Sequence, residues 1–511
     1  MASSAVVDFL SENKTALVVG VIVVYIAQQI LTYNRLRHIP GPWLASWSEL
    51  PHSKWIFHGL TWQWYRDISA KYGPIARIGP TSVLTSSPEV WIHVNTKPGY
   101  KKSDWYFKPV RVEYGKDNIF SQTDTEKHDL RRKQLAPGYS GRENLELERS
   151  IDAKVQELLD LINNKYLSTD AKAVPMDLAK KIQFLTLDVI STVAFDGNFG
   201  MLKTDEDVLG FIKSSEDGLT IGNLFMAFGL SWLVQAPGIG KFLGPKPTHK
   251  TGFGAMMARC FKYIDERVKN PEDKRRDMLA SFIRHGVKGD DLRSEVLEQL
   301  VAGSDTTAGA LRAIMLHIIA NPRVQRKLQK EIDEIVASGK VAAISEGIIS
   351  QTTAKSLPYM QAVIREGLRV WPPVQNYLPK DVPKGGDTIM VNGNPVFLPE
   401  GTCIGISARQ MHHDRKLYGE DAEFFRPERW LEEKDAAKLA AMTKVNNMSF
   451  GYGKWECLGK PVATMEINKT LFEGFRHFDW AIATPATPWE ISNAFGLFLI
   501  NKQWVQITAR S

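Results

Sequence analysis

An uncharged stretch near the start of the chain, Ala16 to Tyr33, most constrains how the chain can fold. As a helix it would be roughly 27 Å long at about 1.5 Å per residue, just enough to cross the apolar part of a bilayer. A buried core helix is one alternative. A cleaved signal peptide is another, but it would need a basic leader and a small-residue cleavage site, and neither is evident. We therefore expect a membrane anchor over residues 1–33.

The charges around this stretch predict its orientation. Asp8 and Glu12 precede it, whereas Arg35 and Arg37 follow it. Because basic residues stay on the cytosolic side, we expect a single-pass protein whose body faces the cytosol.

Two prolines around a glycine in "HIPGPW" make a stiff break behind the anchor. We expect a hinge over residues 34–47 and one large domain over residues 48–511, since no second Pro/Gly-rich linker or repeat follows. Asn13 opens a glycosylation triplet, which we expect to stay unused so near a membrane.

Composition excludes several classes of protein. The net charge is +7, but no basic run is long enough for a nucleic-acid arm, so we expect no nucleic-acid partner. Three cysteines without paired spacing argue against a disulfide scaffold and against zinc ribbons. A cysteine that does chemistry here must therefore act alone.

Hydrophobic periodicity predicts a mainly α fold with a small β region. Two hairpins are expected, at Pro74 to Ser87 and at Thr388 to Leu398. Three long helices are expected at Leu147 to Tyr166, Ser294 to Ala320 and Val324 to Val336.

The apolar stretch from Ile221 to Val234 shows no single helical face. Two interpretations stay open: a buried part of the core, or a mobile lid over an apolar pocket that dips toward the membrane.

The predicted helix at Ser294 to Ala320 contains "AGSDTT". Asp305 and Thr306 are unusual in an apolar helix, and a buried carboxylate there must be paired, hydrogen-bonded or neutral. Ala302 and Gly303 remove side-chain bulk, so a flat group could approach the backbone. An acid beside an alcohol indicates a proton relay, and the alternative is a kinked helix whose threonine bonds back to the preceding turn.

Glu366 and Arg369 lie three residues apart on another predicted helix, a spacing that permits an ion pair. Most such pairs decorate a surface, but apolar neighbours favour a buried structural pair here. Arg429 lies in an aromatic setting further along the chain.

The loop "FGYGKWECLGK" holds one cysteine, Cys457, among three glycines. Lone-thiolate ligation fits a haem iron better than zinc, and glycines let backbone N–H groups point at the sulfur. A buried free cysteine and a nucleophile with a distant histidine partner are the alternatives.

These motifs together resemble the cytochrome P-450 monooxygenases. Phe450, Gly453, Cys457 and Gly459 match the haem-binding loop F-x-x-G-x-(R/H)-x-C-x-G of that family. The "AGSDTT" helix resembles the family's oxygen-activating helix. Glu366, Arg369 and Arg429 resemble its structural ion cluster, and "IPGP" resembles the proline hinge of microsomal members.

The resemblance implies which residues would hold the cofactor, haem b. Cys457 would be the axial ligand of the iron, and His128, Arg132 and Lys380 would bind haem propionates. Trp455 departs from the family pattern, which has arginine or histidine there, so it brings an N–H donor but no charge.

The resemblance also implies the reaction. One atom of O2 would enter a hydrophobic small molecule, with NADPH electrons supplied by NADPH-cytochrome P-450 reductase and with cytochrome b5 as a second candidate donor. Asp305 and Thr306 would deliver protons. The expected location is the endoplasmic reticulum membrane, and the looser likeness to pisatin-demethylase-like enzymes points to fungal secondary metabolism of terpenoids, polyketides, alkaloids or phytoalexins.

Two other functions remain open within this resemblance. The same fold could couple, dehydrate or isomerise a substrate, although the retained acid–alcohol pair favours oxygen activation. The chain could also be a non-catalytic membrane-anchored haem binder.

By position, the substrate pocket would be apolar with a few polar groups. Its expected walls are Ala302, Val374, Gln375, Asn376, Tyr377 and Phe495. Basic residues near the cysteine loop are candidate contacts for an acidic reductase: Arg131, Lys133, Lys454 and Lys460.

Overall fold

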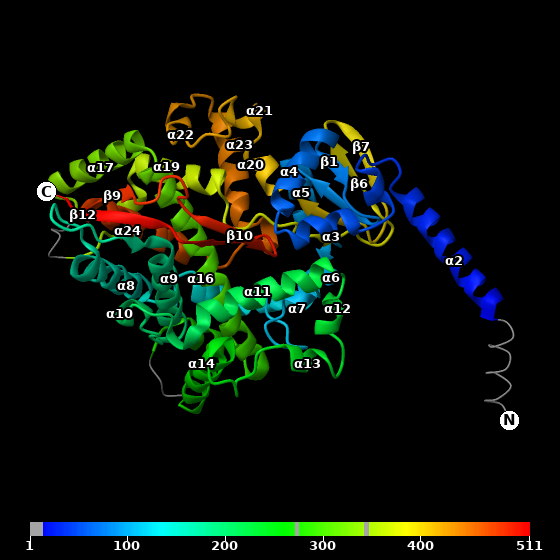
Figure 1. Ribbon diagram of the computed structural model, residues 1–511, viewed down its shortest axis with the longest axis horizontal. Helices are drawn as coiled ribbons and strands as arrows, with labels where there is room; N and C mark the ends of the chain where they lie inside the picture. Colours follow the sequence, from blue (N-terminus) through cyan, green and yellow to red (C-terminus); the bar gives the residue numbers. More distant parts are fainter. Residues whose placement is uncertain (1–13, 271–274, 342–346, 511) are drawn as a thin grey trace.

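A computed structural model describes residues 14–270, 275–341 and 347–510. Asn13, Asp8 and Glu12 lie outside the described residues, as does the rest of the predicted anchor before Lys14. From Lys14 a single helix, α2 (Lys14–Arg35), projects away from the body (Figure 1). It is long and apolar enough to cross a membrane, and none of its most apolar window is buried within the protein. The alternative of a buried core helix is therefore wrong for the described part of this stretch.

The body is built mainly from long helices, which confirms the predicted class (Figure 1). Its principal helices are α7 (Thr125–Tyr139), α8 (Leu147–Leu161), α9 (Leu178–Phe195), α11 (Phe211–Ala227), α14 (Gly252–Lys269), α16 (Gly289–Ile319), α17 (Pro322–Ala337), α19 (Pro358–Val370) and α24 (Lys460–His477). The three helices expected from periodicity correspond to α8, α16 and α17. A π-helical turn, Ile162–Tyr166, completes the first of them, and α16 begins five residues before its expected start at Ser294.

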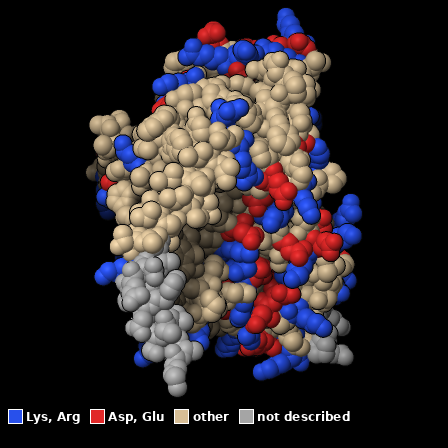
Figure 2. Space-filling view, turned by 90° about the vertical axis from the view of Figure 1, so that its right-hand side faces the viewer, with Lys and Arg blue, Asp and Glu red and all other residues tan. Residues whose placement is uncertain are grey.

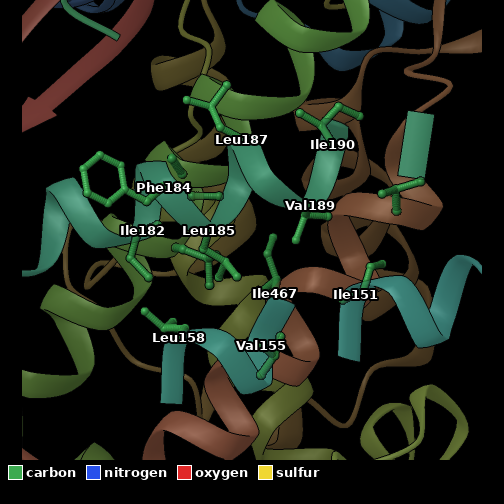
Figure 3. Packing of buried hydrophobic residues seen from close by; sticks show 14 of the residues in the cluster. Ile151, Val155, Leu158, Ile182, Phe184, Leu185, Leu187, Val189, Ile190 and Ile467 are labelled. Carbon is green, nitrogen blue, oxygen red and sulfur yellow. The ribbon is translucent and has the colours of Figure 1, made fainter. Parts of the chain in front are cut away.

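The main core includes the packing of α9 against α8 and α16, and Figure 3 shows its side chains beside those of α8 and beside Ile467 of α24. Nearly every residue of α9 is buried, because neighbours cover it on all sides. Ile182 and Val189 of α9 and Ile467 of α24 are among these core residues. Burying one such side chain contributes roughly 1.5–3 kcal/mol, so this packing holds α16 firmly in place.

The β region consists of small sheets beside the helical body. The largest has the order β1 (Ile75–Arg77), β2 (Ser82–Thr85), β8 (Cys403–Ile406), β5 (Lys380–Asp381) and β3 (Lys101–Lys102). The others pair β6 (Asp387–Val391) with β7 (Asn394–Leu398), β10 (Glu490–Ala494) with β11 (Leu497–Asn501), and β12 (Trp504–Ala509) with β4 (Met176–Asp177) and β9 (Phe478–Ile482).

Both predicted hairpins are confirmed. β1 and β2 pair antiparallel, and so do β6 and β7. Asn392 and Gly393 make the second turn with positive φ values of 51° and 80°, the conformation that an Asn-Gly hairpin turn requires.

The stretch from Ile221 to Val234 is more ordered than its sequence indicates. α11 continues to Ala227, and α12 (Ser231–Val234) adds one more turn, so the stretch is largely helical although its apolar residues follow no single face. Asn223 and Met226 are buried, whereas Ile221 is 56% exposed. One side of α11 packs on α3 (Leu50–Phe57), and the other leaves apolar side chains uncovered.

Exposed apolar residues gather near this stretch and near the described part of α2. Phe228 is 65% exposed and lies edge-on to Phe57 of α3, with ring centroids 5.8 Å apart. Trp232 and Trp43 are also largely exposed. Figure 2 shows this side of the molecule, where a broad uncharged area contrasts with intermixed acidic and basic residues beside it.

Candidate active site

The cysteine loop presents its sulfur at the start of α24. The backbone N–H groups of Gly459 and Lys460 donate to the Cys457 sulfur. The Cys457 N–H donates to the carbonyl of Phe450 at 2.7 Å, which closes the loop. A helix N-terminus and two N–H donors both favour the thiolate.

Glycine is required in this loop by conformation. Gly451 and Gly453 have φ values of 81° and 62°, and a Cβ on Gly451 would lie 2.8 Å from the carbonyl oxygen of Trp455. Burial raises the pKa of the Cys457 thiol, yet the side chain retains an open surface. The sulfur is therefore surrounded by protein without being covered by it.

The centre of α16 also has an open face. Ala302 is exposed and Thr306 is half-buried, although both lie in the middle of a helix most of whose residues are buried. The Thr306 hydroxyl donates to the Ala302 carbonyl at 2.7 Å. Gly303 serves another purpose than expected. A Cβ there would lie 2.8 Å from Cγ1 of Ile190, so this glycine permits close packing against α9 rather than the approach of a flat group.

Asp305 is buried between α16 and α9. Gln183 Nε2 donates to Asp305 Oδ1 at 2.7 Å, and Arg312 Nη2 donates to Gln183 Oε1 at 2.6 Å. Burial raises the pKa of Asp305 to about 6, against the opposing effects of Arg312 and Gln183. The acid is therefore held near the neutral range, where it can both give and take a proton.

Trp455 lies at the centre of a group of cations. The His128 ring packs on the indole with centroids 4.3 Å apart. The ammonium groups of Lys102, Lys380 and Lys454 lie 5.2, 5.1 and 4.9 Å from the ring centroid. The indole Nε1 is buried and has no hydrogen-bond partner in the described structure, so it is a donor that awaits an acceptor.

Two of these lysines are cross-strand partners. Lys102 of β3 is paired with Lys380 of β5, and both are almost fully buried. Burial lowers the pKa of Lys380 to about 7, and burial together with the charge of Lys380 lowers that of Lys102. Neither forms an ion pair within the described part of the chain. Like charges directly opposite each other are unfavourable unless an anion lies between them.

Lys102 is the functional candidate that sequence reasoning missed. Its ammonium donates to the carbonyls of Ile119 and Phe120 at 2.8 and 2.7 Å. The only signal in the sequence is the Lys-Lys pair at 101–102, and nothing there distinguishes the buried lysine from the exposed one.

The two expected residues of α7 differ in charge. Arg132 Nη1 donates to the carbonyl of Glu456 at 2.6 Å, directly before the cysteine. His128 is buried, and burial together with the charge of Lys102 lowers its pKa to about 4. His128 is therefore neutral at physiological pH, and the positive charge near Trp455 comes from Arg132 and the lysines.

The structure brings Glu366, Arg369 and Arg429 together. Arg369 Nη2 and Arg429 Nε each approach Glu366 Oε1, at 2.8 and 2.9 Å. Trp430 Nε1 donates to Glu366 Oε2 at 2.9 Å. Arg369 also donates to three backbone carbonyls, those of His412, Ala422 and Phe424. The side chains of Glu366, Arg369, Arg429 and Trp430 are all buried.

The six expected pocket residues separate into groups. Asn376, Tyr377 and Phe495 line a cavity between α3, α11 and the β10–β11 turn, whose lining includes neither Ala302 nor Val374. The Tyr377 hydroxyl bonds to the carbonyls of Val83 and Cys403, which ties it to the large sheet.

The other residues lie elsewhere. Val374 forms a β-bridge with Leu497. Gln375 is 2% exposed, and neither of its side-chain polar atoms has a partner in the described structure.

The four basic residues expected at a docking face are mostly engaged. Arg131 pairs with Glu295 at 2.6 Å, Lys460 with Glu456 at 2.9 Å, and Lys454 approaches Asp129 at 3.8 Å. Lys133 is exposed.

The arrangement fits a haem with two propionates. The Cys457 sulfur supplies a soft ligand held by N–H donors. The unpartnered indole N–H and the two opposed buried lysines supply the hydrogen-bond donors and the positive charge that two carboxylates require. A zinc site would need further ligands, and the described residues contain no cluster of three His, Cys, Asp or Glu that could hold a metal.

Comparison with known proteins points to the same family. The sequence model described as cytochrome P-450 matches residues 40–508. The chain is 38% identical to the cytochrome P-450 monooxygenase ABA1 of Pyricularia oryzae (strain 70-15) over the full length of both. It is 37% identical to aba1 of Botryotinia fuckeliana (strain B05.10), over 93% of this chain and 92% of the relative. It is 33% identical to abl1 of Leptosphaeria maculans, over 92% and 82%. The chain belongs to the cytochrome P-450 family of monooxygenases.

Proposed function

We propose that the protein inserts one atom of O2 into a hydrophobic small molecule, and that Cys457 is the axial ligand of its haem. The observation that carries this proposal is the Cys457 sulfur at the N-terminus of α24, which keeps an open surface and is held by two backbone N–H donors. When bound there, haem would supply the iron that activates O2.

The chain's own residues would hold the cofactor and move protons. The Trp455 indole N–H, Arg132, Lys102 and Lys380 would bind the propionates, with neutral His128 packing on the indole. Thr306 would position water on the open face of α16.

Asp305 would supply protons from the other side of α16, and the hydrogen bond that it accepts from Gln183 would orient its carboxyl. A carboxyl with a pKa of about 6 is suited to this exchange near neutral pH.

We assign the electrons to NADPH through NADPH-cytochrome P-450 reductase, with cytochrome b5 as a second donor. Lys133 is the most accessible of the basic residues near the cysteine loop for an acidic partner. The body would be held at the cytosolic face of the endoplasmic reticulum by residues 1–33, with a hinge over residues 34–47 before the catalytic domain.

Exposed apolar residues support contact with the bilayer beside the anchor. Phe228 and Trp232 lie near the end of α11, and Trp43 lies close behind α2. This placement favours a combination of the two interpretations of Ile221 to Val234. One side of the stretch is buried in the protein, and the other side would face the membrane.

The organisms of the relatives indicate the broad class of metabolism to which the substrate belongs. Three relatives of the chain are fungal monooxygenases, so we assign the reaction to fungal secondary metabolism. The acid–alcohol pair favours oxygen activation over dehydration or isomerisation, because the cleavage of O2 consumes protons that must be delivered, whereas those two reactions consume no O2.

The test is reconstitution of the full chain with reductase and NADPH in lipid nanodiscs, using extracts of a fungal host as substrate source. We expect NADPH consumption that rises with an extract fraction, and a product that carries one isotopic atom when labelled O2 is used. A product without the label would support oxidative coupling, isomerisation or dehydration. Haem binding without any substrate-dependent turnover would support a non-catalytic binder.

A further inference from the structure

Glu298 lies on the open face of α16, one turn before Ala302. Glu298, Ala302 and Thr306 are spaced by four residues, so they follow one side of the helix. Glu298 and Thr306 are half-buried and Ala302 is exposed, while Leu297, Gln299 and Leu300 are buried. An acid therefore lies in line with the two residues on the open face of α16.

Asn118 fixes one oxygen of this acid. Asn118 Nδ2 donates to Glu298 Oε2 at 3.0 Å. The orientation of the amide is set by its own oxygen, which accepts the backbone N–H groups of Phe120 and Ser121 at 3.0 and 2.8 Å. Asn118 is 2% exposed, so Glu298 is held by a rigid buried donor.

The charges around Glu298 are engaged elsewhere. Glu295, one turn earlier on α16, pairs with Arg131 at 2.6 Å. Lys102 donates to the carbonyls of Ile119 and Phe120, and within the described ranges no cation lies at ion-pair distance from Glu298.

The carboxyl of Glu298 is therefore without a counter-ion. Burial and the charge of Glu295 raise its pKa to about 8, against Lys102 and Asn118. At neutral pH it is mainly the neutral acid, which has one O–H to donate and oxygens that accept.

Glu298 and Cys457 both lie near the C-terminal end of α7. Burial, and after it the charges of Glu295, Cys457 and Glu298, raises the pKa of the Tyr139 hydroxyl at that end of the helix.

We propose that Glu298, oriented by Asn118, determines specificity by binding an uncharged hydrogen-bonding group, a hydroxyl or a ketone, on an otherwise hydrophobic substrate. This inference rests on the proposed haem site. The apolar part of the substrate would lie along Ala302, and the neutral acid would donate to a ketone or accept from a hydroxyl. A hydrocarbon of the same shape would leave the buried carboxyl with one unmet O–H, which disfavours it.

The test uses N-alkylimidazoles, whose ring nitrogen binds haem iron and gives a spectral shift whatever the tail does. A series of chain lengths is prepared, each ending in a methyl or a hydroxyl, and Kd values are measured by titration of the haem-loaded full chain. We expect at least one length at which the wild type prefers the hydroxyl tail about tenfold. Glu298→Gln, which keeps a donor and an acceptor, retains this ratio, and Glu298→Leu abolishes it.

The control is Ser304→Ala, on a buried side of the same helix, where only a bond within the helix is lost. It should leave every ratio unchanged. The proposal is overturned if Glu298→Leu keeps the wild-type ratio at every length, or if the wild type shows no preference. A lower melting temperature in Glu298→Leu with unchanged ratios would make Glu298 a structural counter-charge to Lys102 instead. Absence of any spectral shift would overturn the haem proposal itself, which is a separate result.

Discussion

Two groups of buried charges in this protein are built in opposite ways. The ion cluster around Glu366 satisfies itself. Its carboxylate accepts from Arg369, Arg429 and Trp430, and the spare donors of Arg369 reach backbone carbonyls. The group around Trp455 lacks partners of its own. Lys102 lies opposite Lys380 on the neighbouring strand, and the indole N–H has no partner among the described residues.

This difference separates structure from function. A buried charge whose partners all come from the chain holds the fold together. Removing one partner leaves the others buried without a counter-charge. A buried group of cations without anions is costly in the protein alone and becomes favourable only when a ligand brings negative charge. The first cluster should therefore control whether the protein folds, and the second whether it retains its cofactor.

The largest effect is expected from Glu366→Gln. This change leaves Arg369 and Arg429 buried without a counter-charge, which costs about 3–5 kcal/mol. We expect little soluble haem-loaded protein, measured by the ratio of haem absorbance to protein. Asp217→Asn, which breaks an exposed pair with Lys213, should change stability by less than about 0.5 kcal/mol. A normal yield and melting temperature for Glu366→Gln would break the distinction between the two groups.

The next effect is expected on proton delivery. Thr306→Ala should leave haem binding intact but divert electrons to peroxide, with a loss of product on the order of 10²-fold if the hydroxyl takes part in general acid–base catalysis. The measurement is peroxide formed per NADPH consumed, with Thr307→Ala as the neighbouring control. Unchanged coupling would remove Thr306 from the mechanism.

Asp305 adds a pH dependence to the same site. Its pKa in the folded protein, about 6, is above its ordinary value, so the wild type loses stability as pH rises from about 4 to about 6. Asp305→Asn mimics the protonated acid and lacks this loss, which is about 3 kcal/mol for a shift of this size. We expect the melting temperature of the variant, relative to that of the wild type, to increase as the pH rises from 4 to 6.5. A constant difference across that range would mean that Asp305 ionises as an exposed acid does.

A smaller effect is expected for Lys380→Met, which should stabilise the haem-free protein but weaken its hold on haem. Burial lowers the pKa of Lys380 to about 7, so the wild type without haem loses stability as pH falls from the ordinary lysine range toward 7. The variant should therefore melt higher than the wild type when haem-free at pH 7, with a gap that closes toward pH 10. With haem it should release the cofactor faster. Lys101→Met removes the exposed neighbour and should do neither. A variant destabilised in both forms would indicate a purely structural lysine.

The smallest effect is expected at Trp455. Trp455→Phe keeps the ring near the ammonium groups but removes the N–H. The free-energy barrier to haem release should therefore fall by about 1 kcal/mol, the value of one hydrogen bond. Trp455→Arg restores a donor with charge and should retain haem. Loss of haem from the Arg variant, with none from the Phe variant, would show that the indole packs rather than pairs.

The sequence was most informative where a motif is local. Cys457 with its glycines, the Glu366–Arg369 spacing and the acid–alcohol pair each lie within a few residues, so the chemistry could be predicted before the fold. Lys102 could not be predicted, because its role depends on a cross-strand partner almost three hundred positions away. Gly303 was misinterpreted for a similar reason, since Ile190 of another helix decides what that glycine is for.

The helical order of α11 was missed because its apolar residues are not confined to one side. α11 packs on both α3 and α14, whereas Ile221 and, just beyond the helix, Phe228 and Trp232 are exposed. A pattern of hydrophobicity cannot separate burial in protein from exposure beside a membrane.

The most direct test of the central claim is the absorbance spectrum of the reduced, CO-bound full-length protein, beside that of Cys457→His. Thiolate ligation predicts a Soret band displaced far to the red in the wild type. In the variant, we expect the band at the shorter wavelength of histidine-ligated haem. A wild-type band at that shorter wavelength in freshly prepared protein, or a red-displaced band that persists in Cys457→His, would contradict Cys457 as the ligand of the iron.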